Sequence, residues 1–216
     1  MWVRIFALLL WLSAGQAASQ AIRVIDGDTF QLADTRIRIL DIDAPELGQI
    51  CKTSTGKSYK CGESSAKALG ELLDLGRVRC AGRKTDSYGR LLATCTVGGQ
   101  DIGALMVAAG EAVAFVKYGR TYLPQQVDAQ KAGRGLWRGT FEMPWDFRKA
   151  QWQEAAAQVP DSACPIKGNI NARGDRIFYT PASRHYRKTV VNQARGERWF
   201  CDEADAIAAG WRAPYR

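Results

Sequence analysis

Residues 21–45 read AIRVIDGDTFQLADTRIRILDIDAP, and this stretch decides the fold. Apolar and polar residues alternate within AIRVI, TFQLA and RIRILDI, which is the period-two pattern of half-buried strands. The turn-forming pairs Asp26-Gly27 and Ala33-Asp34 separate the three runs. The stretch therefore predicts three antiparallel strands that follow one another in a meander.

Two more strands and three helices are predicted after the meander. The runs RVRCAG and RLLATCTV flank a polar connection, which is typical of a β-hairpin. Apolar residues at helical spacing, bounded by capping or turn residues, predict helices in three segments: 66–73, 102–109 and 124–131. A brief strand is expected at AVAFV, residues 112–116. Five strands interleaved with three helices predict an α+β fold built on a small five-stranded β-barrel.

Residues 1–17 have the pattern of a secretory signal peptide. One arginine precedes an apolar run over residues 5–12, and small residues follow, with a cleavage point after Ala17 or as late as residue 21. A membrane anchor is the alternative, but a span needs about 20 apolar residues, and no other segment offers such a run. We therefore expect a monomeric protein, secreted or periplasmic after cleavage, without stable membrane insertion.

Basic residues outnumber acidic ones, with 30 Lys and Arg against 22 Asp and Glu. The formal net charge is +8 and the pI is about 9.3, which favours an anionic partner such as nucleic acid, an acidic glycan or a lipid headgroup. Charge alone does not choose between these partners. The apolar share of 46% is ordinary for a globular protein and argues against wholesale disorder.

The chain has six cysteines, and all of them follow the predicted signal peptide. An even number of cysteines in an exported chain predicts disulfides. Several connectivities are possible in principle, and the spacing favours three local pairs: Cys51 with Cys61, Cys80 with Cys95, and Cys164 with Cys201. The sequence contains no Cys-x-x-Cys pair and only one histidine, His185, which argues against thiolate zinc, Ser-His and multi-histidine chemistry.

Four short segments carry residues that suit phosphodiester chemistry. They are VIDGDT (24–29), RILDIDAPE (38–46), DSYGR (86–90) and AQKAGRGLW (129–137). Each alone has a structural explanation as a hairpin turn, a solvated strand end, a loop or a helix cap. In this order and spacing, they resemble the thermonuclease (staphylococcal-nuclease-like) family over roughly residues 22–137. Four segments in register are far more specific than one motif, because independent coincidences multiply.

The resemblance implies an OB-fold and calcium-dependent hydrolysis of DNA or RNA. By position it implies these roles: calcium ligands Asp28, Asp43 and the Ala44 carbonyl, phosphate-contacting arginines Arg38 and Arg90, and the water-activating base Glu46. Calcium prefers such oxygen donors, and planar guanidinium groups suit phosphate better than lysine does. In this family the 5′-oxygen leaves, so the resemblance also implies products with a 3′-phosphate.

The substrate-contacting positions depart from the better-known members of the family. We expect Tyr88, Phe115 and Lys117 to contact the substrate. Phe115 and Lys117 stand where the family often has two tyrosines, so base stacking is retained at Phe115 while the phenolic contacts are lost. Ala44 stands where threonine is familiar, which a backbone-carbonyl ligand tolerates, although a hydroxyl contact to metal-bound water is lost.

The strand that carries Arg38 presents a geometric difficulty. Strict alternation places Arg38 on one face of the strand and both Asp41 and Asp43 on the other. A bulge or a strand end must intervene, and Pro45, which removes a ladder donor, favours a strand end there. Asp41 has no assigned role. It is either a carboxylate on the rim of the site or a buried, hydrogen-bonded one.

The end of the chain is predicted to be a small separate module. We expect a thermonuclease-like domain over residues 20–150, a linker over 151–163 and a basic, disulfide-stapled module over 164–216. The module resembles one appended to secreted bacterial nucleases and, more faintly, a metal-binding DNA-repair module whose zinc cysteines it lacks. Two roles stay open for it: a basic surface that aids substrate capture and contributes little to catalysis, or a packed C-terminal cap.

Three functions compete at this point. They are a secreted calcium-dependent nuclease, a non-catalytic module that binds nucleic acid or another polyanion, and a role in polysaccharide export. The full set of carboxylates and arginines favours the nuclease, because a pure binder has no reason to keep it. No paired-carboxylate signature of sugar chemistry is identifiable, which argues against the third function.

Overall fold

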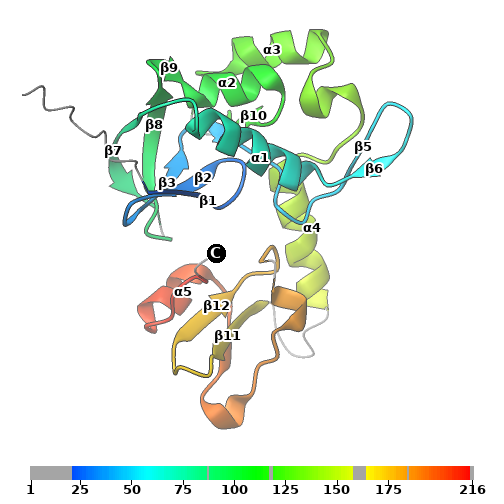
Figure 1. The fold of residues 1–216 in the computed structure, drawn as a ribbon. Coiled ribbons are helices and arrows are strands. Elements are labelled where there is room, and N and C mark those ends of the chain that lie inside the picture. Colours follow the sequence, from blue (N-terminus) through cyan, green and yellow to red (C-terminus); the bar gives the residue numbers. More distant parts are fainter. Residues whose placement is uncertain (1–20, 87, 117–118, 158–163, 184, 215–216) are drawn as a thin grey trace, which may run out of the picture.

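The computed structural model describes residues 21–86, 88–116, 119–157, 164–183 and 185–214. Figure 1 shows an N-terminal part, which holds the largest sheet and three helices, and a C-terminal module that lies below it. Helix α4 (Pro144–Ala157) runs between the two parts. The predicted signal peptide, residues 1–17, and the end of the predicted linker, residues 158–163, lie outside the described residues.

The largest sheet contains the predicted meander and hairpin. Its strands follow the order β1 (Ile22–Val24), β2 (Thr29–Leu32), β3 (Thr35–Ile39), β8 (Leu91–Val97) and β7 (Val78–Thr85), with β9 (Gln100–Asp101) also paired to β8. Neighbouring strands are antiparallel except β3 and β8, which are parallel. All five expected strands are therefore present, and their closure into a barrel stays a prediction.

The three helices predicted for the N-terminal part are present as α1 (Cys61–Leu73), α2 (Ile102–Ala109) and α3 (Leu123–Lys131). Asp101 caps α2, because its side chain accepts a hydrogen bond from the Ala104 backbone N–H at 3.0 Å. Gly110 ends this helix in the left-handed conformation, with φ of +73°. A short 3₁₀ turn, η1 (Gly135–Arg138), follows α3.

Two helices of the described residues were not predicted, namely α4 and α5 (Glu203–Ala208). The total in these residues is five α-helices rather than about three. Because α4 ends at Ala157, residues 151–157 of the expected linker are helical, and the domain boundaries themselves stay a prediction. The physical reason is composition, since this segment is rich in Ala, Gln and Glu, which are strong helix formers.

Two short strand pairs complete the N-terminal part. Strand β4 (Ile42–Asp43) pairs with β10 (Val113–Ala114), and β5 (Cys51–Lys52) pairs with β6 (Ser58–Tyr59). Apolar residues of the strands and of α1 and α2 form one core, with fully buried side chains such as Phe30, Ile37, Ile39, Leu69 and Met106. The strand pair of β4 and β10 thus joins the segment after Arg38 to this core.

The C-terminal module has a core of its own. Its sheet has the order β12 (Arg176–Tyr179), β11 (Ile166–Ile170) and β13 (Arg198–Phe200), and two 3₁₀ turns, η2 (Tyr186–Lys188) and η3 (Gln193–Arg195), lie in its loops. We call its buried apolar side chains the module core: Ile166, Phe178, Phe200, Ala206 and Trp211. Trp152 of α4 packs against the module core, which attaches the module to the helix that precedes it.

Three disulfides are present, with the pairings expected from the sequence: Cys51–Cys61, Cys80–Cys95 and Cys164–Cys201. Cys80 and Cys95 lie directly opposite each other on β7 and β8, so this bond ties the two arms of the hairpin. Cys164 and Cys201 bracket the sheet of the module. Within the part of the chain described, no helix is long and apolar enough to cross a membrane.

Candidate active site

The strand that carries Arg38 ends before the aspartates that follow it. Strand β3 stops at Ile39, and Asp41 has φ of +59°, a left-handed conformation that non-glycine residues rarely adopt. The chain resumes as β4 at Ile42, which resets the alternation and brings Asp43 into hydrogen-bond contact with Arg38. The expected strand break is therefore present, but it lies at Asp41 rather than at Pro45.

Asp28 and Asp43 are buried and share one arginine. Their exposed fractions are 3% and 0%. Arg38 Nη1 donates to Asp28 Oδ1 at 2.7 Å, and Arg38 Nη2 donates to Asp43 Oδ1 at 3.0 Å. Thr29 Oγ1 and the Ala44 backbone N–H also donate to Asp28, at 2.7 and 3.2 Å. The structure thus brings together the predicted metal ligands and one predicted phosphate arginine, with partners that a buried carboxylate requires.

The arginines keep this cluster charged. Burial raises the pKa of Asp28, but Arg38 and Arg90 outweigh burial and hold that pKa below its usual value. Burial likewise lowers the pKa of Arg38, and Asp28 and Asp43 more than compensate, so this pKa lies above its usual value. The site therefore carries fixed charges of both signs at neutral pH.

The turn that presents Asp28 packs tightly against helix α1. A Cβ atom on Gly27 would overlap the Ser65 hydroxyl and approach Ala44 Cβ to 2.7 Å. Ser65 is itself fixed, because its hydroxyl donates to the Glu111 carbonyl at 2.6 Å. Glycine is therefore required in the Asp-Gly-Asp turn, and helix α1 determines where Asp28 lies.

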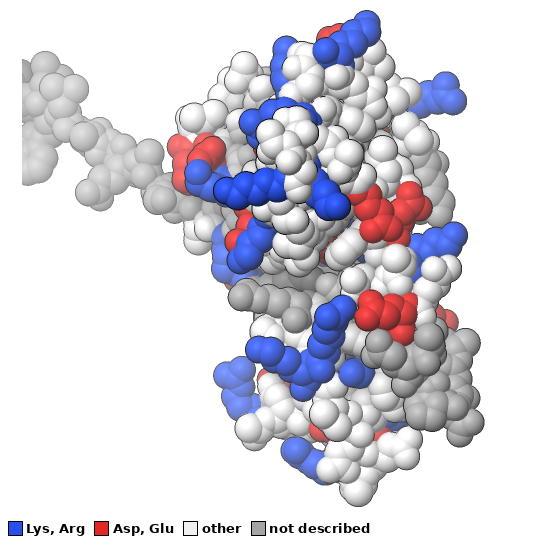
Figure 2. Space-filling view, turned by 90° about the vertical axis from the view of Figure 1, so that its right-hand side faces the viewer, with Lys and Arg blue, Asp and Glu red and all other residues white. Residues whose placement is uncertain are grey.

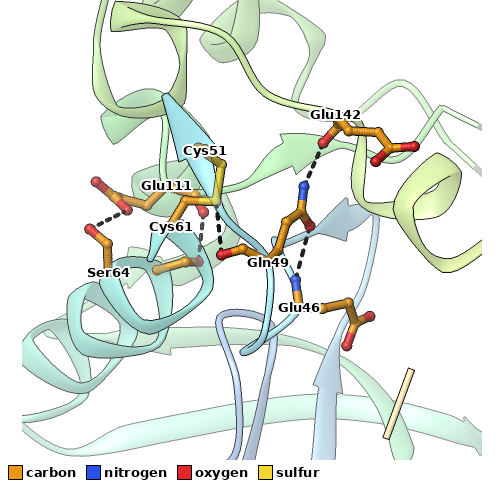
Figure 3. The surroundings of a disulfide bond; sticks show 8 residues. Glu46, Gln49, Cys51, Cys61, Ser64, Glu111 and Glu142 are labelled. Carbon is orange, nitrogen blue, oxygen red and sulfur yellow. Dashed lines mark hydrogen bonds between the residues drawn. A yellow bond between two sulfur atoms is a disulfide. The ribbon is translucent and has the colours of Figure 1, made fainter. Parts of the chain in front are cut away.

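Glu46 follows β4 and is held through its backbone. The Glu46 N–H donates to Gln49 Oε1 at 3.2 Å, and Gln49 Nε2 donates to the Glu142 carbonyl at 2.6 Å. Gln49 is fully buried beside the Cys51–Cys61 disulfide, and Figure 3 shows the Glu46 carboxylate directed away from that disulfide. The buried Gln49 thus fixes the predicted base by its main chain, and the Glu46 carboxylate lies at the cleft.

Arg148 is a site residue that the sequence analysis missed. Its Nη1 donates to Asp43 Oδ1 at 3.0 Å and to Glu46 Oε1 at 2.9 Å, and its Nη2 donates to Asp43 Oδ2 at 2.8 Å. Burial lowers the pKa of Arg148, and the bonds to Asp43 and Glu46 raise it above its usual value. No motif marks this residue, because helix α4 brings it to the cluster from outside the four segments.

Arg90 lies on the connection between β7 and β8. Asp86 Oδ1 accepts hydrogen bonds from the backbone N–H groups of Tyr88 and Arg90, at 3.0 and 2.9 Å. Asp86 Oδ2 accepts from Arg90 Nε at 2.8 Å and pairs with its Nη2 at 2.7 Å. Arg90 Nη1 reaches Thr29 Oγ1 at 3.4 Å, next to Asp28. The loop therefore brings the second predicted arginine to the same cluster.

The three expected substrate contacts have different surroundings. Tyr88 is half-buried and packs against the module core. Phe115 is half-buried on the rim of the site, with its ring centroid 5.7 Å from that of Trp145. Lys117 lies outside the described residues. Asp41, which had no assigned role, is half-buried and accepts a hydrogen bond from Thr121 Oγ1 at 2.7 Å.

Most of the site residues line one cleft with a cavity volume of about 590 Å³, and Asp43 is fully buried next to it. One wall belongs to the N-terminal part and includes Asp28, Arg38, Glu46, Arg90 and Phe115. The other wall belongs to the C-terminal module and includes Phe178, Thr180, Ala182, Ser183, Ala213 and Pro214. The volume is in the range of ligand-binding pockets, and charged groups line one wall, as expected for a binding or catalytic site.

The donor chemistry of the cleft suits the calcium ion implied by the resemblance. Asp28, Asp43 and Glu46 supply carboxylate oxygens, which hard cations prefer. In the described ranges, no three His, Cys, Asp or Glu side chains are grouped around a point that could hold a metal ion. The oxygens of Asp43 are paired with Arg38 and Arg148 instead. The donor set fits a hard cation on the condition that Arg148 releases Asp43 and Glu46.

The fold and the cleft together define a small α+β protein with a site of carboxylates and arginines. Residues 36–139 match the family of staphylococcal nuclease homologues. Over 138 residues the chain is 38% identical to succinoglycan biosynthesis protein ExoI of Rhizobium meliloti (strain 1021), with 61% of this chain and 72% of that protein covered.

Two further relatives carry nuclease names. The chain is 33% identical over 140 residues to an uncharacterized endonuclease of Haemophilus influenzae, covering 62% of this chain and 73% of that protein. It is 31% identical over 149 residues to a micrococcal nuclease of Shigella flexneri, covering 61% of this chain and 80% of that protein. The chain belongs to the staphylococcal nuclease homologue family, as the four segments indicated, and this membership implies the OB-fold.

Proposed function

We propose that the protein is an exported, calcium-dependent nuclease that hydrolyses phosphodiester bonds of DNA or RNA. The observation that carries the proposal is one cleft lined by Asp28, Glu46, Arg38 and Arg90, with the buried Asp43 bound to Arg38 beside it. Family membership and relatives named as nucleases support the same reaction.

Glu46 acts as the general base in this proposal. Its side chain is 16% exposed, so water reaches it from the cleft, and its backbone is fixed by Gln49. The carboxylate takes a proton from the water that attacks the phosphorus atom. By the family resemblance the 5′-oxygen leaves, and the product carries a 3′-phosphate.

Arg38 and Arg90 stabilise the negative charge that develops on the phosphoryl group. Both side chains are 18% exposed and are oriented by buried or half-buried carboxylates, so little reorganisation is needed when the charge appears. Calcium held by Asp28, Asp43 and the Ala44 carbonyl would supply the remaining positive charge at the phosphate. Arg148 balances part of the negative charge of Asp43 and Glu46 in the free protein.

The surface charge and the disulfides agree with an exported nuclease. Figure 2 shows Lys and Arg side chains on both parts of the face that it presents, with acidic groups between them. Such a surface favours a polyanionic substrate, and its contacts weaken as salt rises. Three disulfides persist in an oxidising compartment, which agrees with the signal peptide predicted for residues 1–17.

A non-catalytic polyanion binder is the alternative function. It needs basic groups, and it gives no reason for a base in the cleft and two buried carboxylates that share Arg38. A role in polysaccharide production gains one association, the name of the relative from Rhizobium meliloti. The site adds nothing to it, because the carboxylates of this cleft are organised by arginines rather than opposed across a sugar-sized gap.

The test is an assay of the purified mature protein on plasmid DNA, single-stranded DNA and RNA, with calcium, magnesium or excess chelator. We expect cleavage with calcium, loss of cleavage in chelator, and better binding than turnover with magnesium. Mapping of product ends should find 3′-phosphates. Full activity in chelator would reject the calcium assignment, and binding without cleavage under all conditions would favour the polyanion binder.

A further inference from the structure

The C-terminal module contacts the loop that carries Arg90 through the aromatic residue Tyr88. Tyr88 belongs to the hairpin connection of the N-terminal part, yet its side chain packs against the module core. Burial raises the pKa of the Tyr88 phenol, and the Glu203 carboxylate of helix α5 raises it further, so the hydroxyl stays protonated and faces the module. Tyr88 therefore lines the cleft and is at the same time anchored against the module.

The ring of Tyr88 also supports Arg90. The Arg90 guanidinium lies over the Tyr88 ring, with Cζ 4.8 Å from the ring centroid. This distance is typical of a cation–π contact, which fixes where a guanidinium lies. Asp86 holds the same guanidinium from the side, and Arg36 Nη2 donates to the Tyr88 carbonyl at 3.1 Å. The ring thus supports Arg90 together with Asp86 and Thr29, and it is the support that is packed against the module.

We propose that Tyr88 is a positioning residue through which the C-terminal module holds Arg90 at the active site. The inference rests on the proposed function, because that function gives Arg90 its role at the phosphate. The module then takes part in turnover, which differs from the expectation that it aids capture and contributes little to catalysis. Misplacement of a charge-stabilising group by about 1 Å costs up to roughly a hundredfold in rate, so a modest loss of support at the ring has a measurable effect.

The experiment combines substitutions at Tyr88 and Arg90 in the full mature chain. Tyr88→Phe keeps the ring beneath Arg90 and the packing in the module, and we expect turnover within about threefold of the parent. Tyr88→Ala removes both, and we expect kcat to fall roughly 10- to 100-fold with a smaller change in KM. In an Arg90→Ala background, Tyr88→Ala should lower kcat by no more than about twofold further, because the group it positions is already absent.

A second readout does not depend on turnover. The affinity of the protein for a short single-stranded phosphorothioate oligonucleotide, measured in chelator, should fall several-fold in Tyr88→Ala and stay unchanged in Tyr88→Phe. If the parent protein cleaves no substrate while this pattern of affinities holds, the proposed function fails and the positioning role stands. If the parent cleaves and Tyr88→Ala does not alter kcat or affinity, the positioning role fails and the proposed function stands.

The control is Tyr179→Ala in β12, which truncates another half-buried tyrosine of the module. Successive strand residues face opposite ways, so Tyr179 points away from the module core that Phe178 enters. Thermal unfolding verifies that each variant is folded, and the control should keep parental kcat. Two further results would overturn the proposal. Equal losses from Tyr88→Ala with and without Arg90 would indicate a general effect on folding. Equal losses from Tyr88→Phe and Tyr88→Ala would assign the effect to the hydroxyl.

Discussion

The two sides of the cleft are built differently. On the carboxylate side, Asp28 and Asp43 lie next to strand ends, and their partners Arg38 and Thr29 belong to the same N-terminal part. On the arginine side, Arg90 lies on a hairpin connection, and the ring beneath it is packed into the C-terminal module. The N-terminal strands and Arg148 of helix α4 thus organise the carboxylates, whereas one support of Arg90, the Tyr88 ring, depends on the appended module.

The largest effect is expected on the carboxylate side, at the base. Glu46→Gln keeps the shape of the side chain and removes its ability to accept a proton, so we expect kcat to fall by roughly two to four orders of magnitude. Substrate affinity should change little, because the phosphate contacts are unaltered. Steady-state kinetics on a defined oligonucleotide give both values. The matched control is Glu63→Gln, since Glu63 is an exposed carboxylate of α1 with a side-chain exposure of 57%.

If Glu46→Gln retained more than about a tenth of the parental kcat, the base would lie elsewhere. The carboxylate side would then serve to bind the cation and not to activate water. The two sides of the cleft would then differ less, because both would act on the substrate only through their charges.

The sequence predicted the central sheet well because its signals are local. Alternation marks β1 to β3, and the runs around Cys80 and Cys95 mark the hairpin. Helix α4 was missed because its apolar residues follow no clear helical face, and the Ala- and Gln-rich end resembled a connection. The parallel contact of β3 with β8 has no local signal either, since it depends on the path of the chain between them.

The next largest effect is expected from removing the disulfides, which differ between the two sides of the cleft. Replacing Cys164 and Cys201 with serine should lower the stability of the module by about 2 to 4 kcal/mol and reduce kcat through the support of Arg90. Replacing Cys51 and Cys61 should instead disturb the loop after Glu46, on the carboxylate side. Thermal unfolding and kcat at several temperatures distinguish the two variants.

The comparison predicts a difference in temperature dependence. The variant without the Cys164–Cys201 disulfide should lose kcat at temperatures where the N-terminal part is still folded. Unfolding of the N-terminal part is followed separately from unfolding of the module. If the module unfolds in that variant and kcat is unchanged, the arginine side is independent of the module.

A smaller effect concerns Arg148, which joins helix α4 to the carboxylate side. Arg148→Ala leaves Asp43 with Arg38 as its remaining arginine and frees Glu46, so the metal-free protein should lose about 1 to 3 kcal/mol of stability. The freed carboxylates should bind calcium more tightly, and the rise in Tm on adding calcium should be larger than in the parent.

The control for this variant is Glu154→Gln, because Glu154 lies on the same helix in an exposed ion pair with Arg187 at 3.5 Å. Exposed pairs contribute at most about 1 kcal/mol, so calcium should affect this control and the parent alike. An Arg148→Ala variant with a smaller calcium response than the parent would indicate that Arg148 supports the cation site and does not compete with it.

The candidate site was predictable where one motif supplies a group and a second motif supplies its partner. The motif around Asp28 and the motif around Arg38 meet across adjacent strands, so their pairing follows from the meander. Arg148 and the anchoring of Tyr88 depend on contacts between the N-terminal part, helix α4 and the module. No pattern within a segment encodes such contacts, so the packing of Tyr88 against the module core was not predicted, and its contact with substrate stays a prediction.

The smallest effect concerns the pH dependence of stability, which we expect to have opposite directions on the two sides of the cleft. On the arginine side it depends on Glu203 of the module. Burial raises the pKa of Glu203 to about 7, Asp86 and Asp202 add to this, and Tyr88 and Arg90 oppose it. Its Oε2 atom is buried with no hydrogen-bond partner among the described residues. The folded protein therefore holds this proton to a higher pH than the unfolded chain does, and the free energy of unfolding falls as pH rises from about 4.5 to about 7.

Asp28 on the carboxylate side changes the stability in the opposite direction. Its pKa is lowered in the folded protein, so it stabilises the fold at pH values above its usual pKa, and this contribution is lost as pH falls. Glu203→Gln removes the cost on the arginine side alone. We expect little change in Tm at pH 5 and a gain on the order of 1 kcal/mol, or roughly 2 to 4 °C, at pH 8. Glu154→Gln is again the exposed control. Equal shifts of Tm at both pH values would mean that packing, and not the charge of Glu203, governs the contact between the module and the arginine loop.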